Sequence, residues 1–387
     1  MKRDLIFVAL SLLTWGVGES AFIAFQPLYL QELGADPFQI GTIYGAFGLA
    51  ASLVHIPAGY LSDRYGRRPI MWAAWLIGLA ATWVMALANS LPWFVAGMLL
   101  YGMTAFVVAP LNSYVTAARG DFSVGRALTL ISSAYNLGMI SGPIIGGSIG
   151  DRSGFKAIFL FAGGVFIIST ILILFIRDQP RDVPSHHTKN YRLITNARFM
   201  AFLPVFFLVI FATYLPQPLS PNYLQSQHDL SLANIGRLYS ISGIGIVTLN
   251  LTLGHLDARL GFLIGQLAVG LFSILLWKGN SMLAFATGYF LVGGFRTARI
   301  LAMAQVRALI QSADMGLAFG LMETAGALAL ILAAPVSGLF YDRDPESIYI
   351  FSAVMIVGTI LISALYMYYR RTRSYDSLVE QEESTPG

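Results

Sequence analysis

The stretch GYLSDRYGRRP, residues 59–69, gathers one aspartate and three arginines in a chain that is otherwise mostly apolar. Of the 387 residues, 56% are hydrophobic, 11% are charged and 38 are glycine, values far from those of a soluble domain. Such a composition is typical of a protein that crosses a membrane many times. The charged stretch is then a loop between two membrane helices.

The hydropathy pattern predicts an all-α membrane protein with twelve transmembrane helices. A membrane-spanning helix needs about 20 mostly apolar residues. Twelve segments meet this requirement, near residues 5–30, 38–61, 70–88, 92–118, 126–149, 155–176, 199–225, 232–254, 261–277, 282–306, 315–338 and 347–369. We interpret the first as a helix rather than a signal peptide, because its apolar run is long and contains Glu19.

The twelve helices divide into two six-helix bundles. Residues 177–192 are polar, contain two prolines and have no apolar period, which is typical of a linker. We expect an N-terminal bundle at 1–176, a cytoplasmic linker at 177–198, a C-terminal bundle at 199–370 and a cytoplasmic tail at 371–387.

The basic residues determine the expected orientation. Most of the 24 Lys and Arg residues share one side if both termini face the cytoplasm, as the positive-inside rule requires. The net charge of +4 then follows from topology, and no nucleic-acid partner is expected. We expect a monomer integrated in the lipid bilayer of the plasma (inner) membrane.

An internal repeat relates the two bundles. PLYLQ at 27–31 corresponds to PNYLQ at 221–225, IGTIYGAFG at 40–48 to IGRLYSISG at 235–243, and GYLSDRYG at 59–66 to GHLDARLG at 254–261. Five later residues recur at a constant offset of 191: Gly102, Gly125, Gly147, Asp151 and Arg152 match Gly293, Gly316, Gly338, Asp342 and Arg343. Six helices return the chain to its starting side, so the repeats share orientation. We expect a pocket between them near the membrane midplane.

The charged loop has a physical interpretation of its own. Gly59 allows a neighbouring helix to approach closely, and Asp63 can cap a nearby helix N-terminus. Arg64, Arg67 and Arg68 can pair with acidic groups or with anionic lipid headgroups. Alternatively, the arginines form a basic signal that only fixes topology.

The pattern G-x-L-x-D-R-x-G-R-R between the second and third of twelve helices resembles the signature loop of the major facilitator superfamily. The matching residues are Gly59, Leu61, Asp63, Arg64, Gly66, Arg67 and Arg68, and a weaker second copy is matched by Gly254, Leu256, Arg259 and Gly261. The resemblance implies a transporter in which this loop latches the cytoplasmic side while the pocket faces outward.

A second stretch, GMISGPIIGG at 138–147, is similar to the helix 5 pattern of the superfamily's drug:proton antiporters. Its residues Gly138, Gly142, Pro143, Gly146 and Gly147 would let helices of the two halves pack tightly, with Pro143 bending the helix. Alternatively, they form an ordinary small-residue packing face. The resemblance does not extend to the helix 4 arginine of those antiporters, because Met98 occupies its place, four residues before Gly102.

Four charges inside predicted helices are candidate functional groups, because charge at bilayer depth is costly: Glu19, Arg296, Arg299 and Glu323. Glu19 and Arg296 fall near the midplane, on helices 1 and 10 that line the pocket of the resembled superfamily. Glu19 can bind an amine or carry a proton. Arg296 can hold a carboxylate, phosphate or sulfate, or pair with Glu19.

The remaining candidates have a structural alternative. Arg299 and Glu323 lie at similar depth and could form an ion pair. Asn112 and Gln217 could face the pocket or join neighbouring helices by hydrogen bonds. Aromatic residues such as Trp15, Tyr135 and Tyr214 could line an apolar pocket or face lipid.

The sequence predicts a secondary active transporter that alternates access by rocking its two halves. We expect it to export or flip an amphipathic small molecule, drug-like or lipid-like, with protons as coupling ion. The alternative within transport is uptake of an organic anion or zwitterion anchored by Arg296. A membrane sensor or an intramembrane enzyme on the same fold is a different class. No cofactor, metal site or enzyme activity is expected, because the chain lacks cysteine and shows no phosphate loop or metal-ligand cluster.

Overall fold

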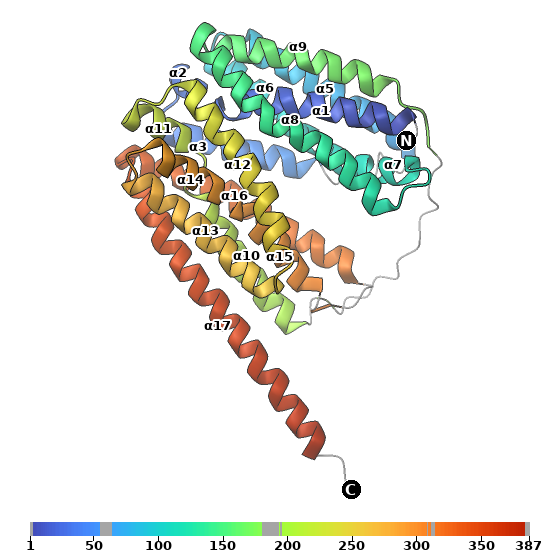
Figure 1. Ribbon diagram of the computed structural model, residues 1–387, viewed down its shortest axis with the longest axis vertical. Coiled ribbons are helices and arrows are strands. Elements are labelled where there is room, and N and C mark those ends of the chain that lie inside the picture. Colours follow the sequence, from blue (N-terminus) through green and yellow to red (C-terminus); the bar gives the residue numbers. More distant parts are fainter. Residues whose placement is uncertain are drawn as a thin grey trace. The chain divides into compact units, whose positions relative to one another are not determined.

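The computed structural model describes residues 3–54, 64–179, 193, 196–307, 309–310 and 314–383, with side chains up to residue 368 (Figure 1). Every regular element in these ranges is a helix. The first half forms α1 (Arg3–Ile23), α2 (Gln26–Glu32), α3 (Pro37–Leu53), α5 (Arg67–Leu87), α6 (Leu91–Gly102), η1 (Met103–Val107), α7 (Val108–Ala118), α8 (Val124–Ser153) and α9 (Phe155–Leu174). The second half forms α10 (Ala197–Tyr214), α11 (Ser220–His228), α12 (Leu232–Leu253), α13 (Ala258–Lys278), α14 (Met282–Leu291), α15 (Gly294–Arg307), α16 (Met315–Arg343) and α17 (Ser347–Glu383).

The helices match the predicted membrane spans. Within the described ranges, ten stretches are long and apolar enough to cross a membrane. α3 and the α14–α15 pair correspond to the two remaining predicted spans, 38–61 and 282–306. They fall short as single helices because α3 has 17 residues, and because α14 gives way to α15 at residues 292–293. The all-α, twelve-helix fold is confirmed.

The first and fourth membrane segments of each half are interrupted. α1 passes into α2 at residues 24–25, and α6 passes into α7 through the 3₁₀ turn η1. In the second half, α10 and α11 are separated at residues 215–219, and α14 and α15 at 292–293. Pro27 and Pro221 occupy the first turns of α2 and α11, where proline prevents the preceding helix from continuing. Interrupted helices are typical of transporter binding sites.

The helices form two compact units. Unit 1 comprises Met1–Ser185, Gln217–Ile244 and Ala334–Pro345, and unit 2 comprises His186–Pro216, Gly245–Ala333 and Glu346–Gly387. Unit 1 therefore contains α11, the first part of α12 and the end of α16 together with the helices of the first half. The sequence boundaries at 176 and 199 stay a prediction.

Unit 1 has two distinct ends. Asp4 accepts a hydrogen bond from the backbone of Arg177, the Tyr114 hydroxyl donates to the Arg177 carbonyl, and Arg68 forms a salt bridge with Asp178. These contacts bring the start of α1, the start of α5 and the end of α9 together at one end, here called the basic end. The opposite end, here called the far end, carries the α5–α6 and α8–α9 connections, which are joined by a hydrogen bond from Lys156 to Asn89.

The core of unit 1 is built on α1, which packs against α8 and α9 (Figure 1). Trp15 of α1 lies at the centre of an aromatic cluster, with ring centroids 4.4 Å from Phe166, 4.9 Å from Trp75 and 6.1 Å from Tyr101. These rings are almost completely buried. Their packing fixes α1 within the unit.

The glycines of α8 correct one sequence prediction. A side chain at Gly138, Gly142 or Gly146 would strike the backbone of α1, in the same half of the chain. Only Pro143 and Gly147 approach α12, a helix of the second half. The expectation that all five motif residues join the two halves is wrong for Gly138, Gly142 and Gly146. Residues four apart share one helix face, so 138, 142 and 146 face α1 while 143 and 147 occupy the neighbouring face.

Unit 2 has a core of its own. Phenylalanines of α10 and α13 pack with small and aliphatic residues of α15 and α16, including Phe199, Phe202, Phe206, Phe262 and Ala298. Thr297 of α15 donates a hydrogen bond of 2.7 Å to Asn250 of α12. These contacts fix which face of α15 is turned away from the core.

Candidate functional site

Glu19 lies on α1, one turn before the helix is interrupted. The Tyr135 hydroxyl of α8 donates a hydrogen bond of 2.7 Å to Glu19 Oε2. Gly16 allows this contact, because a Cβ at that position would lie only 2.5 Å from the Tyr135 carbonyl oxygen. The carboxylate is half-buried and held at a defined position between two closely packed helices.

Tyr101 of α6 adds a second phenol beside Glu19. Its hydroxyl is buried next to the carboxylate and near Tyr135, and among the described residues it has no hydrogen-bond partner of normal geometry. Its ring is fixed by Trp15 and by an edge contact of 5.2 Å with Phe22. Tyr101 stands one residue before the end of α6, so it lies at one interruption while Glu19 lies at another.

A carboxylate beside two phenols can bind either a cation or a proton. A phenol hydroxyl can donate to a carboxylate and can also accept from a carboxylic acid, so the Glu19–Tyr135 contact is compatible with both protonation states. The carboxylate attracts an organic cation, and the neighbouring aromatic faces favour such a ligand further. Exchange of a proton for a cation at one group is therefore chemically possible here.

In unit 2, the two charged candidate residues on α15 are both basic. Arg296 and Arg299 lie on the side of α15 opposite the buried Ala298 and Leu301, and Arg296 is exposed. Arg299 forms an ion pair with Glu323 of α16, as the similar membrane depth expected for the two residues suggests. Arg296 stands three residues beyond the α14–α15 interruption, so it too lies beside a broken helix.

The other polar candidates are more dispersed. Asn112 is exposed on α7, and Gln217 is half-buried in the segment between α10 and α11. Met98 is completely buried on α6, where the resembled antiporters carry arginine. These positions add no further charge to the Glu19 cluster.

The predicted latch is only partly described, because Gly59 and Asp63 lie outside the described residues. Gly66 precedes α5 with φ of 93°, a backbone conformation that favours glycine. Arg64 is exposed and lies 5.6 Å from the centroid of the neighbouring Tyr65 ring.

The two arginines that begin α5 contact unit 1 itself. Arg67 donates to the Ser113 carbonyl oxygen at 3.3 Å, and Arg68 pairs with Asp178 at 2.9 Å. Arg68 also lies over the Trp72 ring, 4.0 Å from its centroid. These contacts join α5 to α7 and to the start of the linker.

Asp151 is a functional candidate that is marked in the sequence only by its place in the repeat. Its Oδ1 accepts a hydrogen bond of 2.8 Å from the Leu232 amide, and its Oδ2 accepts one of 3.1 Å from the Ala233 amide. The carboxylate at the end of α8 thus caps the N-terminus of α12, a favourable placement for negative charge. We call this contact the Asp151 clasp.

Two further contacts accompany the Asp151 clasp at the far end of unit 1. Asn222 of α11 donates to the Pro27 carbonyl at 3.0 Å and to the Gln31 side chain at 2.6 Å. The end of α16 packs on the start of α3, where a Cβ on Gly338 would lie 2.9 Å from Phe38 Cα. The far ends of α2, α3 and α8 are therefore each joined to a helix from the second half of the chain.

Two repeated sets of membrane helices, interrupted where charged and phenolic groups gather, define a membrane carrier. The chain belongs to the Major Facilitator Superfamily, whose family model matches residues 7–262 and 202–386. Proteins of this family are carriers and not enzymes, so this chain is an integral membrane protein that acts on a small-molecule substrate.

Similar proteins cover almost the whole chain. An MFS-type transporter of Methanocaldococcus jannaschii is 23% identical over 383 residues, which are 94% of this chain and 98% of that protein. The quinolone resistance protein NorA of Staphylococcus aureus is 21% identical, over 94% of this chain and 96% of its own. A mutant of the nucleoside transporter NupG has a similar structure, with a TM-score of 0.81 at 17% identity over 94% of this chain and 100% of that one. The structural similarity establishes the fold alone.

Proposed function

We propose that this protein is a secondary active transporter that exports amphipathic organic cations in exchange for protons. The observation that carries the proposal is the Glu19 carboxylate, held by Tyr135 and flanked by the buried Tyr101 hydroxyl at the α1 and α6 interruptions. The names of several relatives, among them the multi-drug resistance efflux pump PmrA of Streptococcus pneumoniae, which matches 51% of this chain, support export.

Exchange follows from competition for one group. A protonated Glu19 is neutral and does not attract an organic cation. A bound organic cation, in turn, favours the ionised carboxylate and so displaces the proton. In each change of access, Glu19 therefore carries either a proton or an organic cation. Inward movement of protons down their gradient then drives the organic cation outward. The phenols keep hydrogen-bonding capacity available in both states.

Alternating access requires contacts that form at one side while the other opens. The positive-inside rule favours a cytoplasmic location for the basic end, so the far end would face the exterior. The Asp151 clasp and the α2–α11 and α3–α16 contacts then belong to an exterior gate. The predicted latch at Gly59, Asp63, Arg64, Gly66, Arg67 and Arg68 would act on the cytoplasmic side.

Proton-driven transport in proteoliposomes tests the proposal. We expect ethidium, a fluorescent organic cation, to accumulate in liposomes with an acidic interior. Glu19→Gln should remove the response to the pH gradient, because the amide cannot carry a proton. Glu32→Gln, which changes an exposed carboxylate on α2, should leave transport unchanged. Gradient-driven accumulation by the Glu19→Gln variant would contradict the proposal.

Tyr135 provides a graded version of the same test. Tyr135→Phe keeps the ring but removes the hydrogen bond to Glu19. We expect ethidium transport to fall about tenfold or more without loss of the pH response, because a hydrogen bond to a charged group contributes about 1.5–3 kcal/mol. Transport at the full rate would show that the phenol does not position the carboxylate.

Arg296 favours a second candidate, the uptake of an organic anion. Its side chain is exposed on the same face of α15 as Arg299, and Arg299 is already paired with Glu323. Binding of a fluorescent organic anion to purified protein distinguishes the two functions. If Arg296 selects anions, Arg296→Gln should weaken anion binding more than ethidium binding, and Arg296→Lys should preserve most of it. Equal losses for both probes would exclude this second function.

A further inference from the structure

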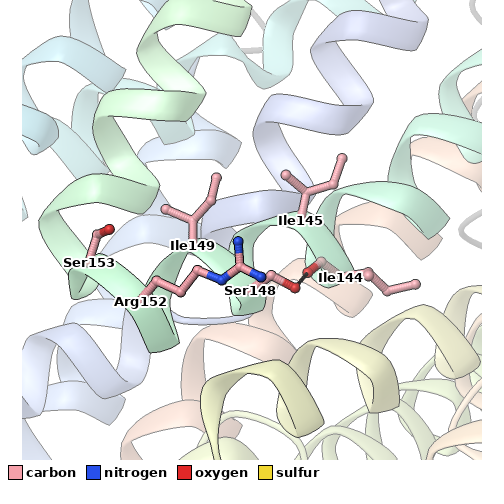
Figure 2. Close-up of a pocket in the computed structure, with 6 residues that line it drawn as sticks. All are labelled: Ile144, Ile145, Ser148, Ile149, Arg152 and Ser153. Carbon is pink, nitrogen blue, oxygen red and sulfur yellow. Dashed lines mark hydrogen bonds between the residues drawn. The ribbon is translucent and has the colours of Figure 1, made fainter.

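A shallow groove follows the last turns of α8 at the far end of unit 1 (Figure 2). It has a volume of about 330 Å³ and is lined by residues of this helix alone: Ile144, Ile145, Ser148, Ile149, Arg152 and Ser153. Three isoleucines give it an apolar surface, and one arginine gives it a single charge. The groove therefore combines an apolar surface, suited to an acyl chain, with the positive charge of an arginine side chain.

The groove lies on a membrane-facing part of the helix. α8 is one of the candidate membrane spans and ends at Ser153, so its last two turns reach the level of the headgroups. Ile144 is 45% exposed, and Leu137, two turns earlier on the same side, is 63% exposed. Exposed aliphatic residues on a membrane-spanning helix contact lipid rather than water.

Arg152 points along the helix into this groove. Figure 2 shows its side chain running back toward Ser148 rather than beyond the end of the helix, with Ile149 and Ile145 on one side of it and Ile144 beyond Ser148. An arginine near a helix end normally extends toward the aqueous interface, because its charge is costly among apolar groups. The observed direction calls for a negative group at the boundary between headgroups and acyl chains.

No described carboxylate supplies that negative group. Arg152 forms no salt bridge or hydrogen bond with any described residue. The neighbouring Asp151 is engaged through both oxygens by the Leu232 and Ala233 amides. Lys156, the other cation nearby, already donates to Asn89. The positive charge of Arg152 is therefore available to a ligand.

We propose that this groove binds one phospholipid molecule. Its phosphate contacts the Arg152 guanidinium, and one of its acyl chains lies along Ile144, Ile145 and Ile149. A guanidinium presents paired donors that suit phosphate oxygens, and aliphatic side chains suit an acyl chain better than a water-soluble anion. The site is distinct from the Glu19 cluster and does not depend on the transported substrate.

The repeat provides a matched control. Arg343 occupies the equivalent place at the end of α16 but stands between Asp342 and Asp344, whose charges disfavour a phosphate. Native mass spectrometry of the purified full-length chain, titrated with phosphatidylglycerol, measures binding. We expect Arg152→Gln to weaken binding of the first lipid about fivefold, the effect of one basic residue at a membrane surface. Arg343→Gln should change it less than twofold.

Three further measurements test the acyl-chain contact, the charge and the lipid assignment separately. Ile149→Ser should weaken phosphatidylglycerol binding while the charge of Arg152 is retained, and Arg152→Lys should preserve most of the binding. Inorganic phosphate should not displace the lipid at equal concentration, since it lacks acyl chains. Equal lipid binding by the wild-type protein and Arg152→Gln would overturn the site. Displacement by inorganic phosphate would overturn the assignment to a lipid.

Discussion

The α8–α12 and α3–α16 junctions, both at the far end of unit 1, have nearly the same packing but different hydrogen bonds. A Cβ on Gly147 would lie 2.9 Å from Ala233 Cα, and one on Gly338 would lie 2.9 Å from Phe38 Cα. Gly236 meets the backbone of Pro143, and Gly41 that of Ala334 and Pro335. The two halves of the internal repeat therefore contribute to two equivalent close helix–helix contacts.

The hydrogen bonds break this equivalence. α12 has an N-cap of its own, Ser231, which accepts from the Asn234 amide at 3.3 Å, and in addition Asp151 of another helix accepts from its Leu232 and Ala233 amides. α3 is capped by its own Asp36, which accepts from the Gln39 amide at 2.7 Å, and its first residue is Pro37, which has no amide proton. Asp342, the counterpart of Asp151, makes no hydrogen bond with the described residues. Separation of the first junction would therefore break the two hydrogen bonds of Asp151, whereas its counterpart Asp342 has none with the described residues to lose.

The largest effect is expected from removing the close approach that both junctions share. Gly236→Leu places a side chain against the Pro143 backbone, and overpacking of this kind costs about 1–3 kcal/mol. We expect ethidium transport to fall about tenfold or more, and Gly41→Leu to have a similar effect. Gly164→Leu, at a position with open space around it, is the control and should transport normally. Normal transport by both junction variants would remove the gate interpretation.

The second prediction separates the junctions. Asp151→Ala removes the carboxylate that caps α12, a contribution of about 0.5–2 kcal/mol, and should favour opening at the α8–α12 junction by about tenfold. Asp151→Asn keeps one acceptor and should be intermediate, and Asp342→Ala should have no measurable effect. Spin labels at Ser153→Cys and Arg237→Cys report the opening, in a chain that has no native cysteine. Equal shifts for Asp151→Ala and Asp342→Ala would refute the asymmetry.

The smallest effect concerns the cap of α3. Asp36→Ala should lower stability by about 1 kcal/mol, the usual contribution of an N-cap, and so slightly lower the thermal unfolding midpoint. The distance between the spin labels should not change, because Asp36 caps its own helix, α3, and not a helix of the α8–α12 junction. A shift in that distance would indicate that the α3 cap is coupled to the gate.

Much of the fold could be predicted from the sequence. Long apolar runs define the membrane helices, and Pro27 and Pro221 mark interruptions that the structure contains. The repeat predicted the paired positions of Gly147 and Gly338. The contacts of Gly138 could not be predicted, because a glycine carries no information about which neighbouring helix approaches it.

The candidate site was only partly predictable. Glu19 and Arg296 stand out because charge is rare inside membrane helices. Tyr135 is one of several aromatic residues that could line a pocket or face lipid, and Tyr101 does not stand out at all, since tyrosine is enriched at membrane interfaces. Asp151 was recognised only as a repeated residue, because its partners are backbone amides 81 and 82 residues away, which have no sequence signature.

Proton release on ligand binding tests the central claim most directly. Purified protein in weakly buffered detergent solution is mixed with ethidium between pH 5.5 and 8.5, and released protons are counted against bound ligand. Competition at Glu19 predicts that up to about one proton is released per ethidium bound, and that Glu19→Gln releases none. Ethidium binding by the wild-type protein without proton release at any pH in this range would contradict the exchange of proton and cation at Glu19.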